Sequence, residues 1–228
     1  MGRLTTSDTR PWPRRVKRGL DVILATCGLI AAAPVLLLIA VLIRLSMGSP
    51  ILFHHVRPGL HGQPFALVKF RTMRQPASRS PALPEETRNR VTRLGSLLRR
   101  TSLDELPELW NVLRGEMSIV GPRPLLMAFL DYYTPEQARR HDVPPGMTGW
   151  AQVHGRREVQ MQERIALDLW YMDHWSLRLD AKIMLETIGQ IVRGSGSEPS
   201  RPVPIEDLGW EKRLAPDADV FANEETGT

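Results

Sequence analysis

The longest feature of the hydrophobic pattern is an apolar run near the N-terminus. Residues Val22 to Ile43 carry no charged side chain and are nearly all apolar, which is about the length that spans a bilayer. The run is too long for a cleaved signal peptide, and Arg44 follows it directly. It is preceded by a basic patch of the kind that stays on the cytoplasmic side of a membrane: Arg10, Arg14, Arg15, Lys17 and Arg18. The pattern therefore predicts a retained membrane segment.

A proline within this run leaves its path through the membrane open. Pro34 follows three alanines that end at Ala33, and a proline inside a helix removes one backbone hydrogen bond and bends the axis. A sharp bend would return the segment to the face from which it entered, whereas spanning helices also tolerate proline. The residues alone allow a single crossing and a re-entrant segment about equally.

The next pattern is that of a β-hairpin. Residues Ile51 to Val56 and Phe65 to Thr72 are rich in strand-forming side chains, and the residues between them, Arg57 to Gly62, carry turn chemistry. In the second strand the period of two places Lys69 and Arg71 on one face. Two cations on one face fit a phosphate site and a solvated strand edge equally well.

A helix with a clear start and stop is predicted between Thr101 and Met117. Apolar side chains recur there at helical spacing, and Gly115 stands where a left-handed cap is needed. Pro107 has no N–H group to donate, which favours a start near Asp104, although Ser102 and Glu105 have the spacing of a capping box. Both starts place Asp104 and Glu105 in the first helical turn, where free N–H groups also suit a bound phosphate.

These two carboxylates have a plain explanation and a functional one. Acidic residues are common in a first turn because the helix dipole favours them there. Here, however, Arg99 and Arg100 lie just upstream, and Arg123 follows in a Gly-Pro-Arg-Pro turn whose second proline stiffens the arginine's backbone. Carboxylates amid so many cations are either neutralised by them or share them with a bound anion.

The remaining pattern predicts further short elements and two irregular regions. Gln75 to Glu86 reads as a surface loop, and residues from Gly194 onward read as a poorly ordered tail. An ordered glycine- and proline-rich loop is expected over 144–157. The other expected elements are a short helix around Leu94–Leu98, an extended piece at 118–120, and helices within 125–133, 135–141, 158–175 and 183–192, the last of which is amphipathic.

Composition narrows the classes of partner. The chain has 30 Lys plus Arg against 25 Asp plus Glu, a balance that suits nucleic acid, anionic lipid or phosphorylated small molecules. The single cysteine, Cys27, excludes a disulfide within the chain and a thiol-based metal site. No cluster of His, Cys or carboxylates has the spacing of zinc ligands.

An ordered set of motifs covers most of residues 15–190, and the set is far more specific than any one motif. Together with the N-terminal apolar segment it consists of Arg57-Pro58-Gly59, Lys69-Phe70-Arg71-Thr72-Met73, Ser102-Leu103-Asp104-Glu105-Leu106-Pro107, Gly115-Glu116-Met117-Ser118, Gly121-Pro122-Arg123-Pro124 and 145–153. By these motifs the chain resembles the monotopic phosphoglycosyl transferases, the bacterial sugar transferases that start polysaccharide and glycoconjugate assembly. The resemblance is to their minimal form.

The resemblance implies a reaction and a set of roles. A sugar 1-phosphate would pass from a UDP-sugar to polyprenyl (undecaprenyl) phosphate, with release of UMP. Asp104 would be the nucleophile that forms an aspartyl-phosphate-sugar, and Asp104 and Glu105 would hold Mg²⁺, with Glu105 as supporting ligand or proton acceptor. The expected phosphate-binding residues are Arg99, Arg123 and Arg156, with Lys69 as a weaker candidate, and Gln152 is expected at the nucleotide.

The resemblance also implies a topology. UDP-sugars are cytosolic, so a re-entrant helix bent at Ala33-Pro34 would keep both flanks at the cytoplasmic face of the bacterial plasma membrane. The family usually has Ser before this proline, and Ala33 lacks that hydroxyl. The expected fold is a mostly helical α/β (α+β) monotopic membrane fold, with a small β-hairpin and several interfacial helices. Its expected parts are a basic segment (1–18), a re-entrant helix (19–47), a catalytic domain (48–193) and a flexible tail (194–228).

Two other classes of function stay open at this point. The chain could be a membrane-tethered binder of nucleic acid or anionic lipid, although its cations are scattered among acids rather than arranged along one helix face. It could also be an inactive scaffold for downstream glycosyltransferases, against which the intact Asp104-Glu105 pair argues. The expected partners are therefore a UDP-sugar, polyprenyl phosphate and membrane lipid, with no nucleic acid, and with room for a homodimer and for later glycosyltransferases.

Overall fold

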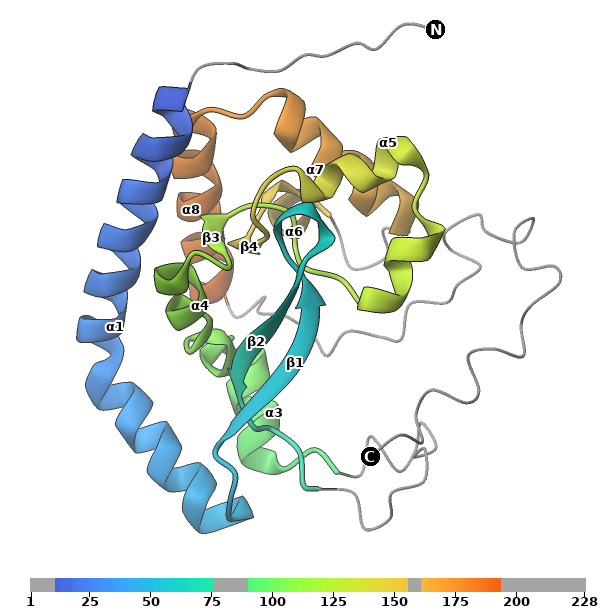
Figure 1. The fold of residues 1–228 in the computed structure, drawn as a ribbon. Helices are drawn as coiled ribbons and strands as arrows, with labels where there is room; N and C mark the ends of the chain where they lie inside the picture. Colours follow the sequence, from blue (N-terminus) through green and yellow to red (C-terminus); the bar gives the residue numbers. More distant parts are fainter. Residues whose placement is uncertain (1–10, 76–89, 156–160, 194–228) are drawn as a thin grey trace, which may run out of the picture.

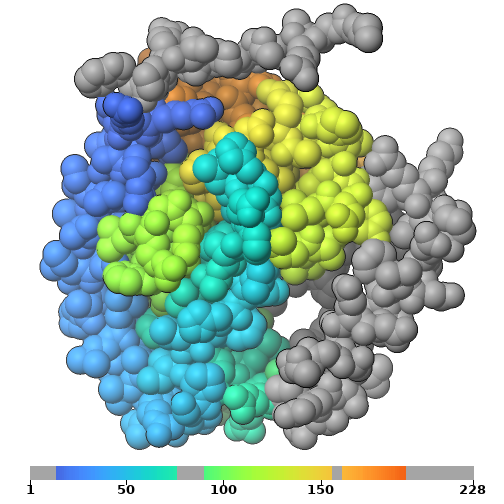
Figure 2. All heavy atoms as spheres, in the orientation of Figure 1, coloured from blue at the N-terminus to red at the C-terminus, as the bar shows by residue number. Residues whose placement is uncertain are grey.

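One long helix flanks the rest of the chain in the computed structural model, which describes residues 11–75, 90–155 and 161–193. This helix, α1 (Pro11–Met47), runs along one side of the molecule, and short helices, two small sheets and loops fill the other side (Figures 1 and 2). The mostly helical architecture with a small β-hairpin agrees with the fold class expected from the sequence. The predicted loop at 75–86 lies almost wholly outside the described residues, as does the predicted tail.

Helix α1 is long and apolar enough to cross a membrane, as judged by length and composition. Most of its apolar side chains do not pack against the chain: Ile30, Leu37 and Leu45 are all about 70% exposed or more. Pro34 lies inside the helix without interrupting it, and the axis curves around the remaining elements (Figure 1). A gentle curve is compatible with a proline whose neighbours keep their hydrogen bonds. The re-entrant path therefore stays a prediction.

Charged side chains at the start of α1 tie it to the rest of the chain. Arg18 donates from Nη1 and Nη2 to the carbonyl oxygens of Val112 and Leu113, at 2.5 and 2.7 Å. The Asp21 carboxylate accepts from the backbone N–H of Ile119 at 3.0 Å, and Lys17 pairs with Asp180 at 2.6 Å. Two cations of the predicted basic patch, Lys17 and Arg18, thus hold α1 against other elements.

The predicted hairpin is confirmed. Strands β1 (Leu52–Pro58) and β2 (Pro64–Phe70) pair antiparallel through a short 3-10 turn, η1 (Leu60–Gly62). Arg71, just past β2, does not share the surroundings of Lys69. Its guanidinium donates to the carbonyl oxygens of Met47, Gly48 and Ser49 at 2.6 to 2.9 Å, so it caps the C-terminal end of α1.

The region around the two carboxylates differs from the prediction in one respect. After α3 (Arg93–Arg100), residues Leu103–Glu105 form a separate 3-10 turn, η2, and helix α4 begins only at Glu108 and ends at Arg114. Asp104 and Glu105 therefore precede the α-helix instead of occupying its first turn. Pro107, which has no N–H group, serves as the N-cap of α4 and separates the two elements. The predicted left-handed cap at Gly115 is confirmed, with φ of 82°.

A second small sheet was only half predicted. The extended piece at Ser118–Val120 is confirmed as β3, but its parallel partner β4 (Gly146–Thr148) lies in the region predicted to be a loop. The two strands approach very closely: a Cβ on Gly146 would lie 2.1 Å from the backbone nitrogen of Gly121. Only glycine allows this approach, which is the reason for glycine at position 146.

The remaining helices follow the predicted ranges with changes in type. The range 125–133 contains a 3-10 turn, η3 (Met127–Tyr132), and the range 135–141 contains α5 (Pro135–Ala138) followed by the 3-10 turn η4 (Arg139–His141). The predicted loop at 144–157 also includes α6 (Trp150–His154). Two longer helices, α7 (Met161–Asp173) and α8 (Leu177–Val192), complete the described chain.

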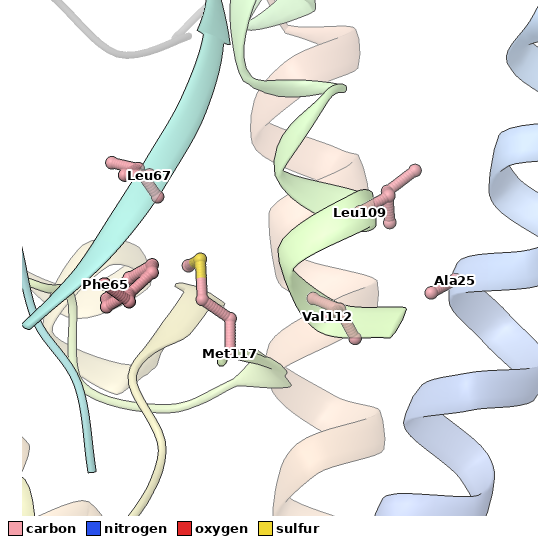
Figure 3. Packing of buried hydrophobic residues seen from close by; sticks show 6 residues of the cluster. All are labelled: Ala25, Phe65, Leu67, Leu109, Val112 and Met117. Atoms are coloured by element: carbon pink, nitrogen blue, oxygen red, sulfur yellow. The ribbon is translucent and has the colours of Figure 1, made fainter. Parts of the chain in front are cut away.

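The core joins α1, the hairpin and α4. Leu109 and Val112 of α4 point toward Ala25 of α1, and Met117 lies between α4 and Phe65 of β2 (Figure 3). Leu67 of β2 completes this cluster. Full burial of an aliphatic or aromatic side chain stabilises a fold by about 1.5–3 kcal/mol. This packing fixes α4 between the membrane-type helix and the hairpin, and the carboxylates lie just before α4.

Candidate active site

Three carboxylates gather where α3, the 3-10 turn η2 and α4 meet strand β2. Asp104 and Glu105 come from η2, and Glu108 opens α4. Asp104 is 8% exposed and Glu108 only 3%. Carboxylates this deeply buried require neighbouring cations or hydrogen-bond donors, because burial of an unpaired charge is costly.

Two of the predicted cations supply that charge. Lys69 Nζ lies 2.7 Å from Glu105 Oε1 and 3.0 Å from Glu108 Oε1. Arg123 Nη2 lies 2.7 Å from the same Glu105 oxygen. Glu105 is therefore the centre of the cluster, because its Oε1 binds one cation from β2 and one from the turn after β3.

Asn111 of α4 fixes the relative position of these elements. Its Oδ1 accepts from the backbone N–H of Val68 at 3.0 Å, and its Nδ2 donates to the carbonyl of Ala66 at 2.8 Å. Nδ2 also donates to Glu116 Oε2 at 2.7 Å. These bonds hold β2 against α4, and as a result Lys69 faces Glu108 from the neighbouring strand.

Two carboxylates of the cluster have a buried oxygen without a hydrogen bond within the described residues: Glu108, whose Oε1 lies 3.0 Å from Lys69 Nζ, and Asp104. The Asp104 Oδ1 is shielded from solvent and has no donor within the part of the chain that the structure describes. Burial and the negative charge of Glu105 raise the pKa of Asp104, and the positive charges of Lys69 and Arg99 oppose that rise. A buried, unsolvated carboxylate oxygen beside cations can act as a nucleophile or as a metal ligand.

Arg123 and Glu105 strengthen each other's charge. The positive charges of Arg123 and Lys69, with their hydrogen bonds, outweigh burial and hold the pKa of Glu105 at about 2. The same pairing raises the pKa of the Arg123 guanidinium. Both groups are therefore charged throughout the physiological pH range.

Glu108 has the opposite behaviour. Its burial and the nearby charge of Glu105 raise its pKa to about 7, although Lys69 and Arg123 act in the other direction. The two cations stabilise the charge of Glu105 more than that of Glu108. Among the described residues, Lys69 forms an ion pair with both carboxylates, whereas Arg123 forms one with Glu105. Glu108 thus changes protonation near neutral pH.

Glu108→Gln is expected to make the folded state more stable than the wild type at alkaline pH. A raised folded-state pKa contributes stability that is complete below the ordinary value of 4.5 and is lost as the pH rises toward about 7. Glutamine has no proton to lose, so the variant avoids that loss. We expect a melting temperature about 4 °C higher at pH 8 and no difference at pH 4. Calorimetry with exposed Glu136→Gln as control tests this, and a pH-independent difference would contradict it.

Arg99 reaches the site from the end of α3. Its Nε donates to Thr72 Oγ1 at 2.8 Å, and its charge acts on Asp104. The chain then turns through Ser102, whose φ of 57° is in the left-handed region that most residues avoid. The side-chain cap from Ser102, the less favoured alternative from the sequence, does not form. The turn instead brings η2 back beside α3, and so Asp104 comes within the field of Arg99.

A fourth cation, Arg57, was not predicted as a site residue. Its Nη2 lies 3.2 Å from His55 Nδ1, and its buried Nε has no hydrogen-bond partner within the described residues. Burial and the charge of Arg123 lower the pKa of Arg57, while Glu108 acts to raise it. Arg57 therefore lies near the cluster as a cation that lacks a close carboxylate partner there. Its place in the Arg57-Pro58-Gly59 motif was the available signal.

The structure does not bring every predicted residue into this cluster. Gln152, at the start of α6, donates from Nε2 to the carbonyl of Met147 at 3.0 Å, and its buried Oε1 has no hydrogen bond within the described residues. Arg156 lies outside the described residues. The cluster thus contains Asp104, Glu105, Lys69, Arg99 and Arg123 from the prediction, and Glu108 and Arg57 in addition.

The carboxylates fit Mg²⁺ in a limited way. Within the described ranges no group of three or more His, Cys, Asp or Glu side chains is arranged to hold a metal. Mg²⁺, however, commonly takes only one or two carboxylates and completes its shell with water and substrate phosphates. The Asp104 carboxylate, whose Oδ1 is buried without a hydrogen bond within the described residues, provides one such ligand.

Comparison with known proteins identifies the family. The sequence model described as "Bacterial sugar transferase" matches residues 12–194. The uncharacterized sugar transferase EpsL of Bacillus subtilis (strain 168) is 46% identical over 192 residues, which cover 84% of this chain and 94% of that protein. A UDP-glucose:undecaprenyl-phosphate glucose-1-phosphate transferase of Caulobacter vibrioides is 45% identical over 202 residues, covering 83% and 76% of the two chains.

A third relative extends the comparison to exopolysaccharide synthesis. The exopolysaccharide production protein ExoY of Sinorhizobium fredii is 40% identical over 208 residues, which cover 84% of this chain and 92% of that protein. The family model extends from α1 to α8. It therefore includes η2, α4 and the segments that carry Arg57 and Arg123. The chain belongs to the bacterial sugar transferase family.

Proposed function

We propose that this protein transfers a sugar 1-phosphate from a UDP-sugar to undecaprenyl phosphate and releases UMP. The names of several relatives state this reaction for glucose. The observation that carries the proposal is the buried Asp104 oxygen, which has no hydrogen bond within the described chain and lies beside a cluster of cations. The two substrates are both phosphate esters, and such a cluster suits them.

The reaction proceeds in two displacements. Asp104 Oδ1 attacks the sugar-linked phosphorus of the donor, an O–P bond to aspartate forms, and the bond to the bridging oxygen breaks so that UMP leaves. A phosphate oxygen of undecaprenyl phosphate then attacks the same phosphorus. The bond to Asp104 breaks, the carboxylate is restored, and a diphosphate-linked sugar is released. The protein ends each cycle unchanged, as a covalent mechanism requires.

The cations make the approach of two anions feasible. Arg123 and Lys69 are held by Glu105, so they are in place before the substrate arrives, and such preorganised charge is the main contribution of proteins to phosphoryl transfer. Arg99 acts on Asp104 from the other side. We assign Arg57 to the same phosphate-binding group, and Arg156 and Gln152 stay predictions for the donor.

Magnesium fits this scheme as a cofactor. Asp104 would hold it, with Glu105 as a second carboxylate. When bound it neutralises phosphate charge and so stabilises the departing phosphate of UMP.

We infer that α1 anchors the site at the cytoplasmic membrane surface. The wide exposed apolar face of α1 supports contact with lipid, and so do exposed apolar side chains of α8 such as Leu185, Ile188 and Val192. Both substrates meet there, since one is cytosolic and the other is a lipid. A re-entrant path for α1 keeps the N-terminal segment and the catalytic part on the same side.

Pro34→Ala is expected to convert the re-entrant path into a crossing. Alanine restores the missing N–H donor and favours a straight helix, which would place the two ends of the chain on opposite faces. Cysteines introduced at Ser7 and Thr228, in a Cys27→Ser background, report this through labelling with an impermeant maleimide. Pro135→Ala, at the start of exposed α5, is the control. If both ends stay cytoplasmic in Pro34→Ala, proline does not turn the chain.

The experiment that tests the proposed function is release of UMP from a panel of UDP-sugars. Detergent-solubilised protein is supplied with undecaprenyl phosphate and Mg²⁺, and the lipid product is followed in parallel. A scaffold would release no UMP with any donor. A binder of nucleic acid or anionic lipid would instead bind RNA or phosphatidylglycerol vesicles with strong salt dependence and without turnover. Either result would overturn the proposal.

A further inference from the structure

A second charged network lies directly behind Arg123. Arg140, which is 2% exposed, donates from Nη2 to Asp168 Oδ2 at 2.6 Å and to the backbone carbonyl of Arg123 at 2.7 Å. Its Nε also reaches Asp168 Oδ2 at 3.2 Å, and its Nη1 donates to the hydroxyl of Tyr133 at 3.2 Å. One guanidinium therefore joins α7, the turn that presents Arg123, and Tyr133, which directly follows η3.

This buried charged network is not explained by its contribution to the stability of the fold. Asp168 is 4% exposed, so both charges are buried, and a buried ion pair often stabilises a fold less than well-packed apolar side chains would. Apolar side chains in place of Arg140 and Asp168, however, could not bind a backbone carbonyl. The carbonyl that Arg140 binds belongs to the residue whose side chain holds Glu105.

The 3-10 turn η4 also lies beside the second turn near the cluster, the one that follows Arg57 at the tip of the hairpin. His141, next to Arg140 in η4, lies near the backbone of Gly59, which follows Arg57 and Pro58. The tip of the hairpin lies beside η4, in agreement with the ribbon (Figure 1). Only a narrow space, too small for a water molecule, is left between the two turns and η4, and it is bordered by Pro58, Pro122, Arg123, Pro124, Arg140, His141, Val143 and Pro145. Prolines thus stiffen both turns, and η4 binds the Arg123 backbone and packs beside the tip of the hairpin.

We propose that Arg140 is a positioning residue that holds the Arg123 backbone and thereby aims the Arg123 guanidinium at Glu105 and at the donor phosphate. Asp168 and Tyr133 keep Arg140 in the required orientation. The catalytic consequence rests on the proposed function. The effect of Arg140 on the backbone of residues 121–124 does not depend on the proposed function.

The test compares Arg140→Lys with Arg139→Lys. Lysine keeps the charge beside Asp168, but a single ammonium cannot reproduce the fork of bonds to Asp168, Tyr133 and the Arg123 carbonyl. Arg139, the adjacent residue, binds Glu136 and Asp173 at the surface and is the matched control. We expect kcat/KM to fall roughly 30-fold in Arg140→Lys, since small displacements of an aligned group cost this much, and to stay unchanged in Arg139→Lys.

A double-mutant cycle separates positioning from general destabilisation. If Arg140 acts through Arg123, then adding Arg140→Lys to Arg123→Lys changes kcat/KM by no more than about twofold, because the group being aimed is already altered. Additive losses would overturn the proposal. Should Arg140→Lys fail to fold, Tyr133→Phe removes only one partner of Arg140, and a smaller, equally non-additive loss is expected.

Hydrogen exchange provides a readout that does not depend on turnover. The amides of residues 118–121 and of Arg123 are expected to exchange at least about tenfold faster in Arg140→Lys than in the wild type and in Arg139→Lys. Unchanged exchange there would refute the positioning role even if activity fell. Faster exchange in a protein that releases no UMP with any UDP-sugar would leave the backbone role standing and refute the proposed function instead.

Discussion

Asp104→Asn is expected to abolish turnover, with a loss of at least about 10³-fold in kcat. Asparagine has nearly the same shape, so the contacts of η2 should survive, but its amide oxygen is too weak a nucleophile to displace UMP. The carboxylate it replaces is buried and carries an oxygen without a hydrogen bond in the described chain, which is the state expected of a group that reacts. The measurement is UMP release at saturating donor and lipid.

Mass spectrometry distinguishes the covalent route from a direct transfer. Wild-type protein incubated with UDP-sugar alone should gain the mass of a sugar phosphate, and Asp104→Asn should not. Asp142→Asn, an exposed acid outside the cluster, is the control and should keep full activity. Kinetics that require both substrates to be bound at once would contradict the covalent intermediate, as would full activity in Asp104→Asn.

Arg123→Lys is expected to lower kcat/KM by roughly 10²-fold, which corresponds to about 2.7 kcal/mol of transition-state stabilisation. Lysine keeps the positive charge, so Glu105 retains a partner, but its single ammonium cannot bind a carboxylate and a phosphate with the fixed fork of a guanidinium. The loss should appear largely in kcat, because charge on the transferred phosphoryl group changes most in the transition state.

Arg114→Lys is the matched control for this variant. Arg114 pairs with Glu116 at 3.1 Å at the exposed end of α4, where a change of cation should leave activity within about twofold. An equal loss in both variants would point to a general effect of replacing arginine by lysine and not to the place of Arg123 in the cluster. A normal kcat in Arg123→Lys would mean that the arginine only holds Glu105 in place and does not contact the phosphate.

The sequence predicted the chemistry of the site better than its local geometry. The hairpin, the short helix before the carboxylates and the left-handed cap at Gly115 follow from local patterns, and all three are confirmed. The pairing of Lys69 and Arg123 with Glu105 was expected only as a cluster of opposite charges. Charge patterns indicate that such groups meet, but the partner atoms depend on distances between β2, η2 and the turn after β3.

The misplaced helix start has a specific cause. Apolar spacing before Pro107 continues the pattern of α4, so the periodicity extends the helix backward through Asp104. A proline removes only one donor, and local sequence does not reveal whether the preceding turn is of α or 3-10 type. The carboxylates therefore depend on the surrounding side-chain cations rather than on the free N–H groups of an α-helix.

Other features depended on contacts between distant segments. The parallel pairing of β3 with β4 joins residues far apart in sequence, and three-residue strands carry too little pattern to be recognised. Glu108 lies on a helix whose acidic start is unremarkable, and only its contact with Lys69 reveals the buried carboxylate. Arg140 is part of a basic tripeptide, in which nothing separates a buried guanidinium from its exposed neighbour Arg139.

The attachment of α1 has a consequence for the lipids in which the enzyme works. Arg18 and Asp21 fasten that helix to the end of α4 and to β3, and Ala25 packs on α4 itself. If α1 lies in the bilayer as proposed, the depth at which it settles sets the height of Asp104 relative to the headgroups. If the protein acts on a lipid-linked phosphate, acyl chains of unsuitable length would lift or sink the reactive oxygen relative to its target, and bilayer thickness would regulate the rate of transfer.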